Sequence, residues 1–166
     1  MKKLTIYIDG ASKGNPGPSG IGVVVCNDRE TIKNISSYIG NCTNNVAEYT
    51  ALIYALQEAL KLKAQTLEIN TDSQLLARQL NKVYKVKNQN IIGLYNQVLH
   101  LKEAFKKVSI TNIPREENRG ADKLANQAIE GQLKEQCSLA KGRAESGRPA
   151  LAGRKVRAPG DSVVGN

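Results

Sequence analysis

The sequence predicts an α/β protein with a five-stranded mixed sheet, in which three antiparallel strands are followed by parallel strands and helices flank the sheet. Three observations lead to this prediction. Strand-like segments come first and follow one another closely, whereas later strand-like segments alternate with helix-like ones. The chain has 166 residues, 40% of them hydrophobic, which suits one compact domain and would be thin for two cores.

The first three strands are predicted from short runs of β-type residues. Residues 4–9 alternate between apolar and polar side chains, the period of a strand, and end at the turn-prone pair Asp9-Gly10. Residues 21–26 are nearly all apolar, residues 31–39 give a weaker strand signal, and a polar segment separates the two. We therefore expect an antiparallel meander whose first strand carries Asp9 at its end.

The pattern then changes to helical periodicity. From residue 46 to residue 62, Leu52, Ala55, Leu56 and Ala59 recur at spacings that share one helix face. The remaining expected elements are a strand at 66–71, helices at 73–83 and 91–106, a strand at 108–113 and a final helix from 119 to about 135. Strands connected through helices are typical of parallel pairing.

The composition changes after Gln136. Residues 137–166 contain no aromatic residue, five glycines, two prolines, six Lys or Arg and only two acids. Such a segment buries too little apolar surface to offset the entropy lost on ordering. We expect a folded domain over 1–136 and a basic, disordered tail over 137–166. The tail either adds phosphate contacts or has no function, and its lack of a motif favours the second interpretation.

The charge and cysteine content of the chain limit which binding partners and structural features are expected. Lys and Arg outnumber Asp and Glu by 24 to 15, giving a net charge of +9, which suits a polyanionic partner but also many ordinary basic proteins. The three cysteines form no C-x-x-C pair, so neither a disulfide framework nor a zinc site is indicated. No segment resembles a signal peptide or a membrane span. We expect a monomeric cytoplasmic protein with no membrane partner.

Four acidic residues are candidates for a shared site, although each has an ordinary explanation. Asp9 can begin an Asp-Gly turn. Glu48, three residues after Asn45, can cap a helix start, and Asp72 can be an N-cap. Asp122 falls in the first turn of a helix, where the helix dipole favours negative charge.

Their combination favours a common function. Glu48 shares a helix face with Leu52 and Ala55 and therefore points towards the sheet. Asp9 and Asp72 both end strands, so neighbouring parallel strands would bring their carboxylates side by side. Acids that converge in this way repel one another by several kcal/mol unless cations lie between them. We therefore expect a site for a hard divalent metal.

Four segments together resemble the motifs of type I ribonuclease H, in that family's order and with similar spacing. They are IDGASKGNPG (8–17), TNNVAE (43–48), TDSQ (71–74) and ADKLAN (121–126). The resemblance extends from residue 1 to about 135. It implies the ribonuclease H-like fold and an endonuclease that hydrolyses the RNA strand of RNA–DNA hybrids, leaving 5′-phosphate and 3′-hydroxyl ends.

The resemblance also implies a cofactor and a set of site residues. Two Mg²⁺ ions, with Mn²⁺ as a possible substitute, would be held by Asp9, Glu48, Asp72 and Asp122. Contacts to the 2′-hydroxyls of the RNA would come from Gly10, Ala11, Asn44, Asn45 and Gln74. Contacts to a phosphate of the DNA strand would come from Asn15 and Thr43. For Gly10 and Ala11 the alternative is an ordinary glycine-rich turn.

The chain departs from the family pattern in two places. The loop 113–119 lacks the histidine that many members carry before the last acidic helix, and His100 lies within the helix predicted at 91–106, where a surface position is expected. Arg115 either replaces the missing group or is an ordinary surface arginine. The connection between Leu80 and Ile91 is too short for the basic protrusion of other members, which predicts weaker binding of hybrids.

Two other functions remain open on the sequence alone. A different metal-dependent nuclease of the same fold could act on DNA, because four carboxylates do not choose between RNA and DNA. A catalytically silent nucleic-acid binding module is the third candidate. Such a module has no need to keep all four acids, and all four are present.

Overall fold

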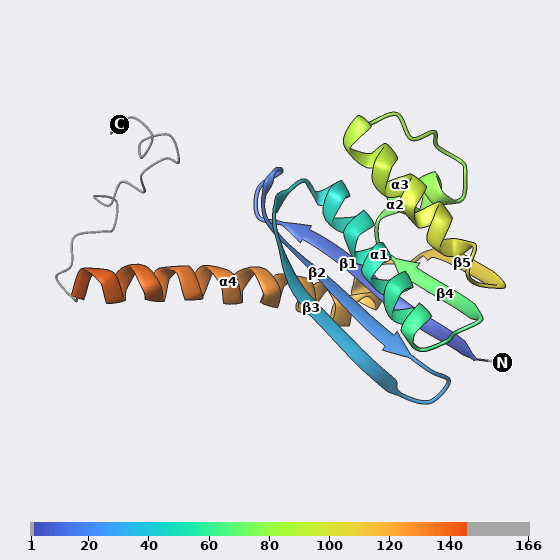
Figure 1. Ribbon diagram of the computed structural model, residues 1–166, viewed down its shortest axis with the longest axis horizontal. Coiled ribbons are helices and arrows are strands. Elements are labelled where there is room, and N and C mark those ends of the chain that lie inside the picture. The colour runs from blue at the N-terminus through green and yellow to red at the C-terminus, as the bar shows by residue number, and fades with distance from the viewer. Residues whose placement is uncertain (1, 146–166) are drawn as a thin grey trace, which may run out of the picture. The chain divides into compact units, whose positions relative to one another are not determined.

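The computed structural model describes residues 2–145 (Figure 1). The strands are β1 (Lys3–Ser12), β2 (Gly17–Cys26), β3 (Thr31–Cys42), β4 (Thr66–Thr71) and β5 (Lys107–Asn112). The helices are α1 (Asn44–Lys61), α2 (Gln74–Leu80), α3 (Gln89–Lys102), the 3₁₀ helix η1 (Arg115–Glu117) and α4 (Arg119–Glu145). The described residues up to Glu130 form one compact unit, which contains the whole sheet, and the described residues from Gly131 onwards, which continue α4, belong to a second unit.

The five strands form one sheet in the order β3-β2-β1-β4-β5. Strands β1, β2 and β3 pair antiparallel, whereas β4 pairs parallel to both β1 and β5. This arrangement confirms the predicted mixed sheet. Ile8 of β1 is level with Thr71 of β4, so the residues that follow them, Asp9 and Asp72, lie next to each other. Contrary to the expectation from the sequence, Asp9 is not at the end of its strand, because β1 stays paired with β2 as far as Ser12.

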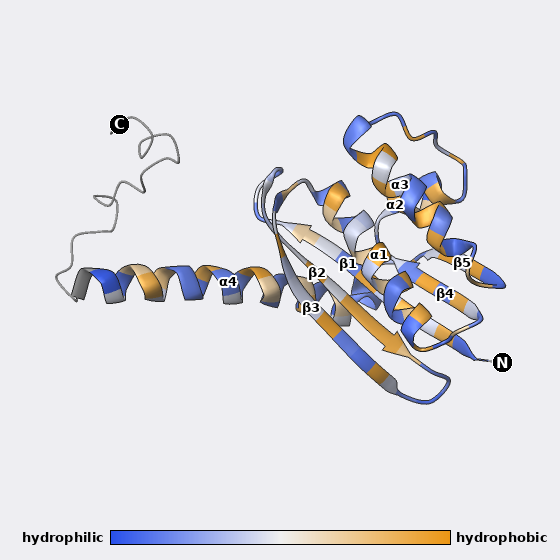
Figure 2. Cartoon of the chain, in the orientation of Figure 1, coloured by the Kyte–Doolittle hydropathy of each residue, from blue (hydrophilic) through white to orange (hydrophobic). Residues whose placement is uncertain are grey.

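One face of the sheet packs against α1 to form the main core. Leu4, Ile6 and Ile8 alternate along β1 and are fully buried, together with Leu52 and Leu56 of α1. Figure 2 shows hydrophobic residues along β2, the strand next to the edge, and alternating hydrophobic and hydrophilic residues along the edge strand β3. Burying these side chains removes them from water and fixes the position of α1 on the sheet.

The opposite face of the sheet receives the first turns of α4. Gly22 of β2 makes this contact possible, because a Cβ atom there would lie 2.1 Å from the carbonyl oxygen of Ala121. The Ser36 hydroxyl of β3 donates a hydrogen bond to the Leu124 carbonyl at 2.6 Å. The close approach holds the beginning of α4, which contains Asp122, against the sheet.

Several element boundaries differ from the expected ones. Helix α2 ends at Leu80 and not at residue 83, because Lys82 adopts a left-handed backbone conformation with φ 62°. Helix α4 continues to Glu145, so residues 137–145 of the expected disordered tail are helical. These residues include Ala, Leu and Lys, which have high helix propensity. Residues 146–166 of that tail lie outside the described part of the chain.

None of the helices found between residues 2 and 145 is long and apolar enough to span a membrane.

Candidate active site

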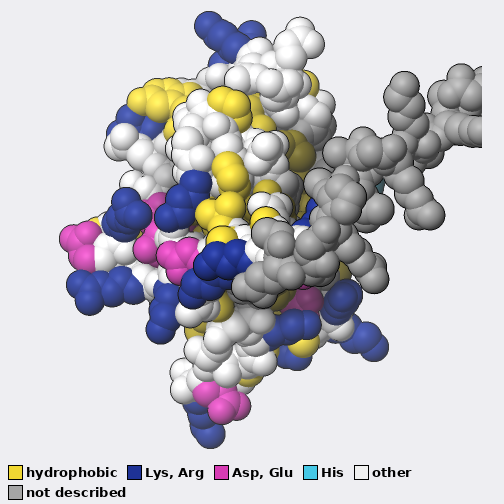
Figure 3. Space-filling view, turned by 90° about the vertical axis from the view of Figure 1, so that its left-hand side faces the viewer, with side chains coloured by type: hydrophobic (Ala, Val, Ile, Leu, Met, Phe, Trp, Pro, Cys, Tyr) yellow, Lys and Arg dark blue, Asp and Glu magenta, His cyan; other side chains and the backbone are white. Residues whose placement is uncertain are grey.

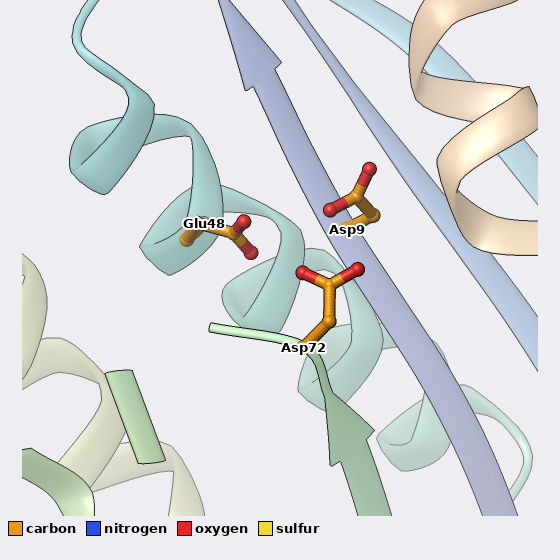
Figure 4. A group of neighbouring side chains, drawn as sticks. All are labelled: Asp9, Glu48 and Asp72. Carbon is orange, nitrogen blue, oxygen red and sulfur yellow. The ribbon is translucent and has the colours of Figure 1, made fainter. Parts of the chain in front are cut away.

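Three carboxylates meet where β4 ends beside β1. Asp9 comes from β1, Asp72 follows the last residue of β4, and Glu48 comes from the second turn of α1. Figure 4 shows their carboxylate groups pointing towards one another. One oxygen from each lies within 4.8 Å of the others. The structure therefore brings three of the four predicted acids into direct proximity.

Glu48 reaches this cluster because α1 begins next to β1. The helix is capped by Thr43, whose hydroxyl accepts a hydrogen bond from the Val46 amide at 3.2 Å, so Glu48 is not the capping residue. Gly10 allows the contact between strand and helix, since a Cβ atom there would lie 2.4 Å from the Glu48 amide nitrogen. The Gly10 backbone amide donates a hydrogen bond to the Glu48 carboxylate.

Burial and mutual repulsion make the cluster electrostatically unfavourable without a cation. Burial, followed by the nearby charges of Asp72 and Asp122, raises the pKa of Asp9 from 3.8 to about 8. Burial, followed by the charges of Asp9 and Asp72, raises the pKa of Glu48 well above its usual value. Oε2 of Glu48 is buried and has no hydrogen-bond partner among residues 2–145. A buried acceptor without a donor is costly, and a divalent cation would satisfy it.

Asp122 belongs to the same cavity but lies outside the group of three. A cavity of about 400 Å³ is lined by all four acids together with Arg115. Nη2 of Arg115 lies 3.3 Å from Oδ1 of Asp122, which makes a partly exposed ion pair. Asn126, one helical turn further along α4, donates hydrogen bonds to the Asp122 carbonyl at 2.9 Å and to its Oδ1 at 3.3 Å.

The expected substrate-binding residues divide into three groups. Gly10, Ala11 and Asn44 line the cavity. Asn15 and Thr43 lie beside them, because Oδ1 of Asn15 accepts a hydrogen bond from the Asn44 amide at 3.0 Å and Thr43 is the N-cap of the same helix.

Two further residues expected to contact substrate are not among those that line the cavity. Gln74 is the exposed first residue of α2, and Asn45 is half-buried in the first turn of α1. His100 is exposed on α3, 4.0 Å from Glu103, in agreement with the expected surface position.

Four residues near the site were not among the expected ones. Ser12, Lys13 and Asn126 line the cavity, and Asn118 is completely buried next to Asp72. For Asn118 the sequence carried a usable signal, since asparagine immediately before a helix is a favoured N-cap. Nothing in the local pattern indicated that the side chain of Lys13 would line the same cavity.

The chemistry of the cluster suits a hard divalent metal. All the donors are carboxylate oxygens, which magnesium and manganese prefer. Positive charge is present at the site as well, because Lys13 and Arg115 line the same cavity as the acids. Figure 3 shows Lys and Arg side chains next to Asp and Glu side chains on one face of the molecule. A cation held by the acids, with positive side chains nearby, would attract a phosphate group.

Comparison with known proteins gives consistent matches over this part of the chain. A sequence model of the family described as reverse transcriptase-like matches residues 7–128, which include all four acids. A bifunctional protein of Mycobacterium tuberculosis is 42% identical over 130 residues, covering 77% of this chain and 36% of that protein. Ribonuclease HI of Halobacterium salinarum is 39% identical over 129 residues, covering 77% of this chain and 65% of that protein.

Solved structures agree with the sequence matches. The ribonuclease H1 of Halobacterium salinarum has a TM-score of 0.76 at 36% identity, covering 78% of this chain and 98% of that one. A ribonuclease H1 isolated from compost, solved in complex with an RNA/DNA hybrid, has a TM-score of 0.75 at 40% identity, covering 78% and 99%. The chain spans about a third of the length of the Mycobacterium relative named above and about two thirds of the Halobacterium relative.

Proposed function

The chain belongs to the reverse transcriptase-like family, and we propose that it is a ribonuclease H, an endonuclease that hydrolyses the RNA strand of RNA–DNA hybrids to leave 5′-phosphate and 3′-hydroxyl ends. The observation that carries this proposal is the group of buried carboxylates around one cavity, with an unpartnered oxygen on Glu48. The names of the relatives support the same activity, since one of them was solved with an RNA/DNA hybrid.

The proposal includes a metal cofactor. The family is metal-dependent, and we assign two Mg²⁺ ions, with Mn²⁺ as a substitute, to Asp9, Glu48, Asp72 and Asp122. When bound, a pair of such ions activates a water molecule and stabilises the leaving oxygen. Because Asp9 holds a proton near neutral pH in the metal-free protein, its carboxyl must release that proton to become a ligand.

Positive side chains at the cavity would bind the phosphate backbone. We assign Arg115 the catalytic role of a cation beside the leaving phosphate, because its guanidinium already lies at the cavity wall next to Asp122. An arginine keeps its charge at every physiological pH and can bind a phosphate through two parallel hydrogen bonds. The ion pair also holds Asp122 in place before substrate binds.

Recognition of the two nucleic-acid strands would use the C-terminal part of β1, the β1–β2 turn and the starts of α1 and α2. The residues assigned to RNA 2′-hydroxyls are Gly10, Ala11, Asn44, Asn45 and Gln74, and those assigned to a DNA phosphate are Asn15 and Thr43. Backbone and amide groups of this kind can donate to and accept from 2′-hydroxyls across a wide minor groove. The hydrogen bond between Asn15 and Asn44 supports the assignment, because it links the two groups of residues.

We also propose a domain arrangement and a setting. The catalytic domain would comprise residues 1–136, with a basic tail over 137–166, and the protein would act as a cytoplasmic monomer. The free cysteines Cys26, Cys42 and Cys137 support a reducing compartment.

A substrate panel tests the proposed activity. RNA–DNA hybrid, duplex DNA and duplex RNA are incubated with the protein in Mg²⁺, in Mn²⁺ and with a chelator. We expect cleavage of the RNA strand of the hybrid alone, and only with metal present. Asp9→Asn provides the matched control, because it removes one ligand charge and keeps the side-chain size. Preference for duplex DNA, or activity that survives the chelator, would refute the assignment.

A further inference from the structure

Asn118 contacts the segments that carry three of the four acids. Its side chain is completely buried, and Nδ2 donates hydrogen bonds to the Ile8 carbonyl at 2.8 Å and to Oδ2 of Asp72 at 3.3 Å. The backbone carbonyl of Asn118 accepts a hydrogen bond from the Asp122 amide at 3.1 Å. Ile8 immediately precedes Asp9. One residue therefore connects β1 next to Asp9, the residue that follows β4, and the beginning of α4.

We propose that Asn118 is a positioning residue that orients the Asp72 carboxylate and thereby sets the affinity of the site for divalent metal. The proposal rests on the proposed function, in which Asp72 is a metal ligand. Asn118 itself acts through Asp72 and the neighbouring backbone.

Of the four acids, Asp72 has the least support from a strand or helix, so its side chain depends most on a hydrogen bond from another residue. Asp9 lies within β1, Glu48 within α1 and Asp122 within α4, whereas Asp72 follows the last residue of β4 and precedes α2. Its backbone is therefore not held by a strand or a helix. Among residues 2–145, the only side chain that donates a hydrogen bond to the Asp72 carboxylate is that of Asn118.

The direction of the Asn118 amide follows from its partners. A carbonyl oxygen and a carboxylate oxygen can only accept hydrogen bonds, so the nitrogen and not the oxygen of the amide must face them. Oδ1 of Asn118 is then left buried and without a partner among the described residues. The buried amide thus makes both of its donated hydrogen bonds while its oxygen stays unsatisfied, which is consistent with a position that needs a donor.

An uncharged hydrogen-bond donor such as the Asn118 amide is also suitable next to a metal ligand such as Asp72. The amide stabilises the Asp72 charge without adding a cation that would compete with the metal, and its two hydrogens fix the carboxylate relative to β1. Residues that orient metal ligands in this way typically change metal affinity or activity by about 10–100-fold when replaced.

Metal binding by variants of the full chain tests the inference. Asn118→Ser removes both donated bonds, and Asn118→Asp places a further carboxylate beside Asp72. We expect the dissociation constant for Mn²⁺, measured by calorimetry without nucleic acid, to rise by about 10–100-fold in Asn118→Ser and further in Asn118→Asp. On hybrid, kcat should fall while KM stays within about twofold, because the substrate contacts remain.

Asn81→Ser is the matched control. Nδ2 of Asn81 also donates to a backbone carbonyl, that of Ile110 at 3.2 Å, but Asn81 contacts no acid of the cluster. We expect unchanged Mn²⁺ affinity in this variant. A folded Asn118→Ser protein whose Mn²⁺ affinity equals that of the wild type would overturn the proposal.

The wild type provides a second measurement that does not depend on the variants folding. In the metal-free protein, the Asn118 side-chain amide protons should exchange slowly with water in NMR spectra, and they should shift on Mg²⁺ titration with the same midpoint as the Asp72 carboxyl carbon. Fast exchange in the metal-free protein, or a shift of Asp72 alone, would overturn the role of Asn118. Absence of metal binding by the wild type would instead contradict the proposed function, while slow exchange would still support the Asn118–Asp72 contact.

Discussion

Helix α1 carries two buried glutamates that differ in the charges around them. Glu58, which is 7% exposed, is paired with Lys33 of β3, whose Nζ lies 2.9 Å from Oε1. Glu48, which is 8% exposed, faces Asp9 and Asp72, and its Oε2 has no hydrogen-bond partner among the described residues. The two ends of one helix thus place the same side chain in opposite electrostatic environments.

The comparison of Glu58 with Glu48 distinguishes a buried glutamate that stabilises the fold from one that serves a functional site. A buried carboxylate that serves packing is neutralised by a nearby cation, because an unpaired buried charge is strongly destabilising. A buried carboxylate surrounded by other acids has no such compensation inside the chain. We infer that the compensation at Glu48 comes from bound metal, and the following predictions test that difference.

The largest effect is expected for Glu48→Gln. Loss of a ligand should reduce metal-dependent cleavage of hybrid by about 10³-fold or more, equivalent to about 4 kcal/mol of transition-state stabilisation. Without metal the same variant should melt at a higher temperature than the wild type near neutral pH, because the raised pKa of Glu48 costs free energy on folding and an uncharged amide does not have this cost. The new amide can also donate to neighbouring carboxylates. Calorimetry in chelator and a cleavage assay check the two parts. A lower melting temperature would mean that Glu48 stabilises the metal-free fold.

At Glu58, near the other end of α1, a substitution should change stability and leave cleavage activity unchanged. Lys33→Met should leave Glu58 buried without its cation and lower the free energy of unfolding by about 1–3 kcal/mol, with cleavage activity unchanged. Because the Lys33 side chain is about half exposed, water would compensate part of the lost interaction. Chemical denaturation of Lys33→Met, Glu58→Gln and the double variant would give the coupling energy. If the effects of the two single substitutions on the free energy of unfolding simply add in the double variant, the Lys33–Glu58 ion pair contributes no stability.

The stability of the metal-free protein should depend on pH through the acid cluster. The pKa of Asp9 is raised from 3.8 to about 8 in the folded state, so between about pH 4 and pH 8 the folded protein binds more protons than the unfolded chain. Stability should therefore fall as the pH rises through this range, by up to about 1.4 kcal/mol per pH unit for each proton. Melting curves in chelator at pH 5 and pH 8 measure the change. Asp9→Asn should flatten it, and a wild-type protein that becomes more stable towards pH 8 would contradict the assigned shift.

The smallest effect is expected for removal of the C-terminal residues. The side chains of residues 133–143 are exposed along α4, so truncation after Gln136 should change the melting temperature by less than about 2 °C. Differential scanning calorimetry of the truncated and full chains makes this comparison. A drop of many degrees would mean that residues after Gln136 stabilise the domain.

Much of the fold was predictable because its signals are local. The alternation at residues 4–9 and the helix face of Leu52 and Leu56 record burial directly in the order of side chains, and both elements are present. The strand at 66–71 was predicted with the same bounds that the structure has. Helix ends were less predictable, because the end of α2 depends on the backbone conformation of Lys82 and not on a periodic pattern.

The sequence by itself determined which acids were candidates, since four carboxylates occurred in motifs of recognisable order and spacing. Only the tertiary structure decided how they are arranged: Asp9, Glu48 and Asp72 are close neighbours, Asp122 is paired with Arg115, and Asn118 bonds to Asp72 across the sheet edge. The physical reason is that these contacts join residues far apart in the chain. Side-chain periodicity records which face of an element is buried, but not which distant polar group that face will meet.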